Sequence, residues 1–226
     1  MNFKRYAVYY TPEQGDLADF GAAWLGWDIA QGQRVTQPPL ASVDLSAITE
    51  RPRPYGFHGT LKPPFRLALD KSFDELHQAL LSIAPSLPTV RLNSLNLSFL
   101  GYFLALTPSR PSAELTILAD RLVQELDDFR AMPSQAELDK RRKAGLSEKQ
   151  EKLLMAWGYP YVLDEFRFHL TLTGPLGTDA IGQIKAKLEP LLKPVLPSPF
   201  EIKDVTLVGE DSAGFFHEIH RYTLGG

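Results

Sequence analysis

The sequence predicts a mixed fold of strands and helices in which one arrangement of elements occurs twice. The tripeptide His-x-Thr lies in two strand-like segments, "YGFHGTLKPPF" and "FRFHLTLTGPL". Each segment is followed by a stretch with helical periodicity and then by one that alternates like paired strands. Because identity between the halves is slight, the order of elements is what indicates an internal duplication.

The first half begins with a strand that is rich in β-branched and aromatic residues and ends at a proline. Its predicted elements are, in order, a strand over residues 5–12, a helix from Asp16, a polar loop over about 32–54, the first His-x-Thr strand, a helix over 72–83, strands over 90–108 and a helix over 112–129. Ser72 and Glu75 have the spacing of a capping box, which fixes the start of one helix. Gly101 marks the turn between the strands.

The second half repeats this order after an insertion. The insertion covers about residues 131–158 and holds two helical pieces, the second capped by Ser147 and Gln150. The second His-x-Thr segment, a helix from about Thr178 and a hairpin around Asp211–Gly214 follow. We expect one domain over residues 1–226, with the insertion beside its cleft.

Composition restricts the classes of function. The chain has 226 residues, no cysteine and a formal net charge of −3. Disulfides and cysteine chemistry are therefore excluded, and a broad nucleic-acid surface is not expected. Neither a signal peptide nor an apolar run of membrane length is evident, which favours a cytoplasmic protein with no membrane partner.

The two motifs place polar side chains on one face of each strand, because alternate residues of a strand point to the same side. His58, Thr60 and Lys62 share a face of the first strand. On the second strand, one face holds Arg167, His169, Thr171 and Thr173. The opposite faces are apolar, as expected for strands with a buried back and a front that lines a cleft.

These residue types suit the hydrolysis of a phosphodiester. One histidine can activate water and the other can protonate the leaving oxygen. The threonine hydroxyls can donate to the non-bridging oxygens, and Lys62 and Arg167 add positive charge. Tyr6 alternates with other tyrosines on the first strand and is a candidate for stacking on a base or sugar. A packing role for a single His-x-Thr would be unremarkable, but two in matching contexts favour a catalytic pair.

The motifs resemble those of the two-histidine (2H) phosphoesterase superfamily, which includes RNA 2′,3′-cyclic phosphodiesterases and 2′–5′ RNA ligases. The segments "RYAVYYTP", "WLGWD", "GYFLALTP" and "WGYPYVLDEFRFHLTLTGPL" are similar to its branch associated with phosphonate metabolism. The resemblance implies a bilobed α+β fold, with antiparallel sheets flanking a central cleft and helices on the outer faces. It also implies metal-independent hydrolysis of a cyclic phosphodiester, with His58, Thr60, His169 and Thr171 as the catalytic set.

We therefore expect a monomeric cyclic phosphodiesterase for a small phosphorylated substrate, possessing no cofactor and no metal. A substrate linked to phosphonate or ribosyl phosphate metabolism fits the resemblance. Two alternatives stay open. The first is a phosphodiesterase or ligase for RNA ends, which the acidic balance disfavours. The second is a non-catalytic module that binds a phosphorylated metabolite, which would have no need of two histidines.

Overall fold

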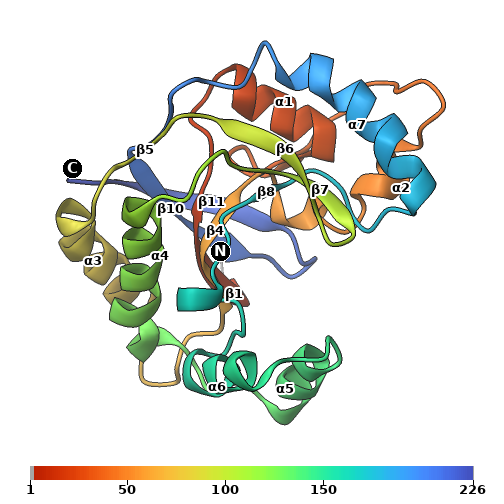
Figure 1. Cartoon of the computed structure of the whole chain (residues 1–226). Coiled ribbons are helices and arrows are strands. Elements are labelled where there is room, and N and C mark those ends of the chain that lie inside the picture. The colour runs from red at the N-terminus through yellow and green to blue at the C-terminus, as the bar shows by residue number, and fades with distance from the viewer. Residues whose placement is uncertain (1–2, 226) are drawn as a thin grey trace.

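The computed structural model describes residues 3–225 (Figure 1). Its strands are β1 (Arg5–Tyr10), β2 (Trp27–Asp28), β3 (Gln33–Arg34), β4 (Gly59–Phe65), β5 (Val90–Leu92), β6 (Leu95–Leu100), β7 (Phe103–Pro108), β8 (Leu170–Thr171), β9 (Phe200–Ile202), β10 (Asp204–Glu210) and β11 (Phe216–Thr223). Its α-helices are α1 (Asp16–Leu25), α2 (Leu45–Thr49), α3 (Phe73–Ile83), α4 (Ala113–Glu125), α5 (Gln135–Arg142), α6 (Glu148–Trp157) and α7 (Thr178–Leu192). Short 3₁₀ turns include η1 (Arg53–Tyr55), η2 (Ala84–Ser86), η3 (Asp127–Phe129) and η4 (Leu163–Glu165).

Seven strands form one sheet in the order β11-β10-β1-β4-β8-β7-β6, and every pairing in it is antiparallel. The strand pair that follows the first motif lies beside the motif strand of the second half, and the pair that follows the second motif lies beside β1 of the first half. Thus β6 and β7 extend the sheet from β8, whereas β10 and β11 lie beyond β1 and β4. A second antiparallel link joins β5 to β9.

The α+β class and the antiparallel pairing predicted from the sequence are confirmed. The structure adds that the two halves meet edge to edge in a single sheet, at the junction of β4 and β8. Capping boxes are present at Ser72, before α3, and at Ser147, before α6, as predicted. The hairpin of β10 and β11 is also where the sequence placed it.

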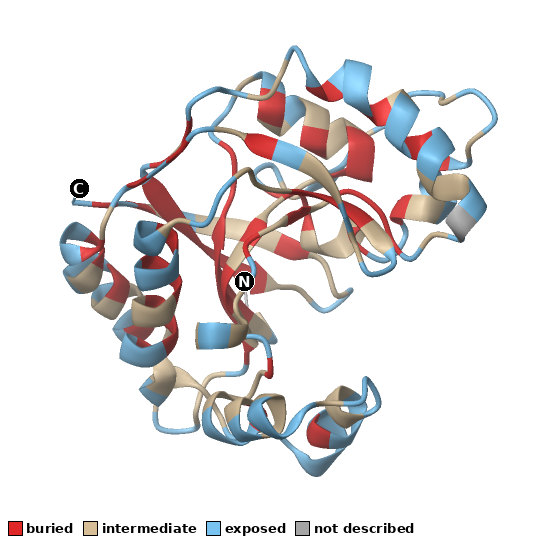
Figure 2. Ribbon diagram, in the orientation of Figure 1, coloured by how far each residue is buried: buried red, intermediate tan, exposed pale blue. Residues whose placement is uncertain are grey.

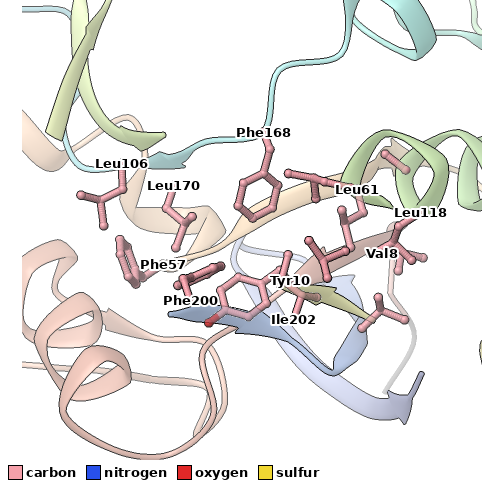
Figure 3. Packing of buried hydrophobic residues seen from close by; sticks show 14 of the residues in the cluster. Val8, Tyr10, Phe57, Leu61, Leu106, Leu118, Phe168, Leu170, Phe200 and Ile202 are labelled. Atoms are coloured by element: carbon pink, nitrogen blue, oxygen red, sulfur yellow. The ribbon is translucent and has the colours of Figure 1, made fainter. Parts of the chain in front are cut away.

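The faces of the sheet have different roles. On β1, Tyr6, Val8 and Tyr10 belong to the main hydrophobic core, while Ala7 and Tyr9 belong to a smaller cluster on the other face. Figure 3 shows core side chains from β1, β4, β8 and β9 pointing toward one another, together with Phe57 from just before β4 and Phe168 from just before β8. The apolar faces of both motif strands therefore pack in the main hydrophobic core.

Helices lie around this sheet in three groups. Figure 1 shows α3 and α4 on one side, α1, α2 and α7 on the other, and α5 with α6 at the bottom of the view. We call α5 and α6, together with the turn between them, the insertion arm. Figure 2 shows that its residues are mostly exposed or intermediate, unlike the buried strands. None of the helices in residues 3–225 has the length and apolarity needed to cross a membrane.

Candidate active site

The two His-x-Thr motifs lie directly opposite each other where the halves of the sheet meet. Gly59 and Leu170, the middle residues of the motifs, are Cα partners of β4 and β8. In an antiparallel pair this register sets His58 opposite Thr171 and Thr60 opposite His169. The histidines are then diagonal neighbours, about 7–8 Å apart at the backbone. A phosphate group fits between side chains at that separation.

The four polar side chains share the face that points away from the main core. Phe57, Leu61, Phe168 and Leu170 are buried in that core, and the motif residues alternate with them. Gly59 is where the motif strands pack most closely. A Cβ at that position would lie 2.4 Å from a carbon of the Phe168 ring, so the ring can cover the strand only because residue 59 has no side chain.

Each imidazole is oriented by a backbone carbonyl two residues earlier. The Nδ1 of His58 is 2.9 Å from the carbonyl oxygen of Gly56, and the Nδ1 of His169 is 2.7 Å from that of Arg167. Since a carbonyl oxygen only accepts, both Nδ1 atoms carry the proton. In the neutral rings Nε2 is then a lone-pair acceptor. The Thr60 hydroxyl donates to Nε2 of His58 at 3.1 Å.

Burial favours the neutral form of both histidines. Burial lowers the pKa of His58 to about 4, although the Gly56 carbonyl opposes the shift, and repulsion from His169 lowers it further. Burial also lowers the pKa of His169. The His58 ring stacks on Tyr9, with ring centroids 3.8 Å apart. Tyr9 is fully buried, which explains why water is excluded from one side of His58.

A cavity of about 510 Å³ adjoins the motifs and is large enough for a small organic phosphate. Thr60, Arg167 and His169 contribute its polar wall. Its aromatic wall consists of Phe99, Phe103, Tyr159, Tyr161 and Phe166. Gln150 of the insertion arm also lines it and donates to Glu165 at 2.9 Å. We call this space the motif cavity.

The profile of a family described as "Protein of unknown function (DUF1045)" matches residues 60–217, well over half of the chain. The chain belongs to the DUF1045 family. It is also similar to two curated proteins named "Ribose 1,5-bisphosphate phosphokinase PhnN". The protein from Janthinobacterium sp. (strain Marseille) is 37% identical over 98% of this chain and 51% of its own length. The one from Laribacter hongkongensis (strain HLHK9) is 34% identical over 76% of this chain and 40% of its own length. The chain thus spans about half the length, or less, of the relatives it matches.

Solved structures with similarity to this DUF1045 chain include one described as a phosphoesterase, at 15% identity and a TM-score of 0.46. Another is E. coli LigT complexed with 3′-AMP, again at 15% identity and a TM-score of 0.46. Both alignments cover all of this chain and all of the matched chain.

Lys62 of the DUF1045 chain is not at the site, which corrects the expectation that it shares a face with Thr60. Thr60 pairs with Tyr9 and Lys62 pairs with Val8, so Leu61 is an extra residue in β4. This irregularity is a β-bulge, and it turns Lys62 to the core side. There the Lys62 Nζ donates to the carbonyl oxygen of Val123 at 2.9 Å, and the residue is 2% exposed.

Tyr6 and Thr173 are also buried away from the motif cavity, contrary to the sequence-based expectation. Tyr6 packs on Phe73 in the main core. The Thr173 hydroxyl accepts a hydrogen bond from the amide of Leu104 at 3.0 Å, which holds the chain after β8. Of the four expected substrate-binding residues, Arg167 is the one that lines the cavity, and it is exposed there.

Tyr159 and Tyr161 line the motif cavity but were not among the residues predicted from the sequence. Both stand in "WGYPY", the aromatic stretch that ends the insertion, and the clustering of aromatic residues just before the second motif was a usable signal. Within residues 3–225, no cluster of three or more histidines and carboxylates has the arrangement of a metal site.

Proposed function

We propose that the protein hydrolyses a small cyclic phosphodiester to a phosphomonoester, with His58 and His169 as the base and the acid. The register of Gly59 with Leu170 is the observation that supports this most directly. It sets two imidazoles and two hydroxyls side by side on one face of the sheet, where Thr60 and His169 line the motif cavity. Structural histidines would have no reason to be matched in this way across the join of two half-sheets.

The proposed reaction uses each side chain for one task. A water molecule attacks phosphorus while its proton passes to Nε2 of the base. The bond from phosphorus to one ring oxygen breaks, and His169, in its protonated imidazolium form, gives that oxygen the proton on its Nε2. With substrate bound, the Thr60 hydroxyl turns from Nε2 of His58 to a non-bridging oxygen and leaves Nε2 free for the water, and Thr171 donates to the other non-bridging oxygen, whose charge grows in the transition state. Arg167 adds positive charge at the cavity wall. We assign the base to His58, because burial lowers its pKa to about 4 and so keeps its Nε2 unprotonated over most of the pH range.

The substrate class we favour is a ribosyl or nucleoside cyclic phosphate, in keeping with a role near phosphonate or ribosyl phosphate metabolism. Three observations support it. The motif cavity is small, its aromatic wall suits a sugar or base, and the relatives' name refers to ribose 1,5-bisphosphate. This chain spans only part of those relatives, so their named activity stays with them.

The test is turnover of a panel of cyclic phosphodiesters, followed by phosphorus NMR, for the wild type and for His58→Gln and His169→Gln. Each variant should lose about 10²–10⁴-fold in turnover, the usual contribution of a general acid or base. His77→Gln is the control. His77 lies on α3, where it bonds to the Tyr222 hydroxyl, and this variant should keep wild-type turnover. Near-native turnover in a folded His58→Gln or His169→Gln protein would overturn the proposal. Binding without turnover across the panel would favour the non-catalytic module instead.

A further inference from the structure

A second cavity, of about 390 Å³, lies between the end of β4 and the insertion arm. Its wall is strongly cationic. The basic side chains that line it are Arg5, Arg66, Arg130, Lys140 and Arg141, with Glu137 as the acidic one. We call this space the arginine cavity. In a chain with a net charge of −3, such a local concentration of positive charge needs an explanation.

Three of the five cations already have a carboxylate partner. Arg5 pairs with Glu210, Arg66 with Glu137 and Arg130 with Asp127. For Lys140 and Arg141, no carboxylate in the described part of the chain lies within 4 Å. The wall with its partners therefore carries two uncompensated positive charges, since five cations face three carboxylates. A phosphomonoester, at about −1.5 to −2 near neutral pH, matches that charge.

Arg130 provides an independent sign that the arginine cavity accepts an anion. Its side chain is 9% exposed, and its Nε and Nη2 donate to Asp127 at 2.8 and 2.9 Å. Its Nη1 is buried and has no hydrogen-bond partner within residues 3–225. A buried donor without a partner costs free energy, and a bound oxyanion would remove that cost. Gly158 makes room for this group, because a Cβ there would lie 2.9 Å from Nη1.

Neighbouring residues line the arginine cavity and the motif cavity along two segments. On β4, Thr60, Leu61 and Pro63 line the motif cavity, and the next residues, Pro64–Arg66, line the arginine cavity. At the end of the insertion arm, Gly158 lines one and Tyr159 the other. The Arg141 guanidinium lies over the Tyr159 ring, 4.6 Å from its centroid. Because a strand advances about 3.3 Å per residue, the two cavities lie within the reach of one extended molecule.

The side chains of the basic run Lys140–Lys143 have different surroundings, and two of them line this cavity. Arg142 turns to Glu151 and holds the two helices of the insertion arm together, with Nη2 to Oε1 at 2.6 Å. Lys143 is exposed and is not part of the wall. Only Lys140 and Arg141 face the cavity, so the run is not a uniformly solvated helix face.

We propose that the arginine cavity binds a second phosphate of the same substrate, at the end remote from the scissile phosphodiester. This inference rests on the proposed function for the identity of the reacting end, but the anion site itself does not depend on turnover. The insertion arm, in this view, sets specificity: it contributes Lys140 and Arg141 to the second site and Gln150 to the first.

The test compares adenosine 2′,3′-cyclic phosphate with its 5′-monophosphate and 5′-diphosphate derivatives. In the wild type, at least one added phosphate should lower KM by about tenfold or more, the effect expected of hydrogen bonds to a charged group, with little change in kcat. Arg141→Gln and Lys140→Gln should remove most of that gain while leaving the KM of the parent compound unchanged. Lys143→Gln, the same charge change in the same run, should keep the gain.

Equal KM values for all three compounds in the wild type would overturn the inference. So would a loss in Lys143→Gln as large as that in Arg141→Gln, because it would indicate general electrostatic attraction. Calorimetric titration with inorganic pyrophosphate separates this proposal from the catalytic one. Suppose that no substrate is turned over, but that pyrophosphate binds the wild type and His58→Gln and does not bind Arg141→Gln. That result would support the second site although the proposed function fails. No pyrophosphate binding in the wild type would count against the site itself.

Discussion

At the scale of single residues, the site depends on how each histidine is fixed. The carbonyl two residues before each ring accepts a hydrogen bond from Nδ1, so Nε2 of each neutral ring is the nitrogen with a free lone pair. The same enclosure that fixes the rings lowers both pKa values, because burial penalises the charged imidazolium. Orientation and protonation state therefore have one physical cause.

This arrangement predicts an acidic optimum for kcat/KM, which reports the ionisations of the free enzyme. The base must be unprotonated, which requires a pH above about 4 for His58. The acid must be protonated, which requires a pH below the lowered pKa of His169. The profile should thus be a bell with its maximum between pH 4 and 6.5, its two apparent pKa values belonging to the pair. His58→Gln should lose the acidic limb and His169→Gln the alkaline one.

The rate at each pH must be measured together with the stability of the protein. The lowered pKa values of the two histidines also determine how that stability changes with pH. A histidine whose folded pKa lies below its unfolded pKa binds fewer protons in the folded state between those values. The contribution of these histidines to the stability of the folded protein is therefore fully present above about pH 6.5, and it is lost as the pH falls toward 4. The melting temperature at each pH identifies the range in which the protein stays folded. An optimum above pH 7 in that range would contradict the assignment of base and acid.

At the scale of elements, β4 shows what the sequence could predict and what it could not. The period of two correctly set His58 and Thr60 on one face and Phe57 and Leu61 on the other. The rule fails at Lys62, because a bulge adds one residue opposite Val8 and no turn residue announces it. From the sequence alone, the ammonium group of a lysine in an apolar strand can either face the cleft or bond to the end of a neighbouring helix.

Lys62 instead ties β4 to the end of α4, where the last carbonyls of a helix lack partners. Its Nζ bonds to the carbonyl of Val123 and lies 3.8 Å from Asp127, and burial lowers its pKa to about 8. Lys62→Ala should therefore lower the free energy of unfolding by about 2–4 kcal/mol, through a lost charged hydrogen bond and a cavity. The turnover of the folded protein should change little. Urea unfolding with the midpoint and slope measured together checks this.

Lys152→Ala is the matched control, since Lys152 is exposed on α6 and lines neither cavity. It should change the free energy of unfolding by less than about 0.5 kcal/mol. If Lys62→Ala were as stable as Lys152→Ala while its KM rose sharply, the side chain would belong to the substrate site after all.

At the scale of the whole molecule, the duplication was predictable and the exchange of strands was not. Element order gave each half a motif strand, a helix and a strand pair, but sequence order does not say which motif strand a hairpin will join. In the structure β7 pairs with β8 and β10 pairs with β1, so each strand pair joins the other half and ties the halves together. The insertion arm was foreseen as two helices beside the cleft, yet the ion pairs that set its direction are long-range contacts such as Arg66 with Glu137.

The link between β5 and β9 offers a direct test of whether the halves must move for turnover. Arg91 and Glu201 are Cα partners in this antiparallel pair, at a separation compatible with a disulfide, and the chain contains no other cysteine. The oxidised Arg91→Cys/Glu201→Cys variant closes a long loop and should gain about 2–4 kcal/mol of stability over its reduced form. Turnover should be the same in both forms, because neither residue lines the motif cavity. The single variant Arg91→Cys controls for loss of the native ion pair. A turnover that falls on oxidation and returns on reduction would show instead that the two halves must shift relative to each other during the reaction.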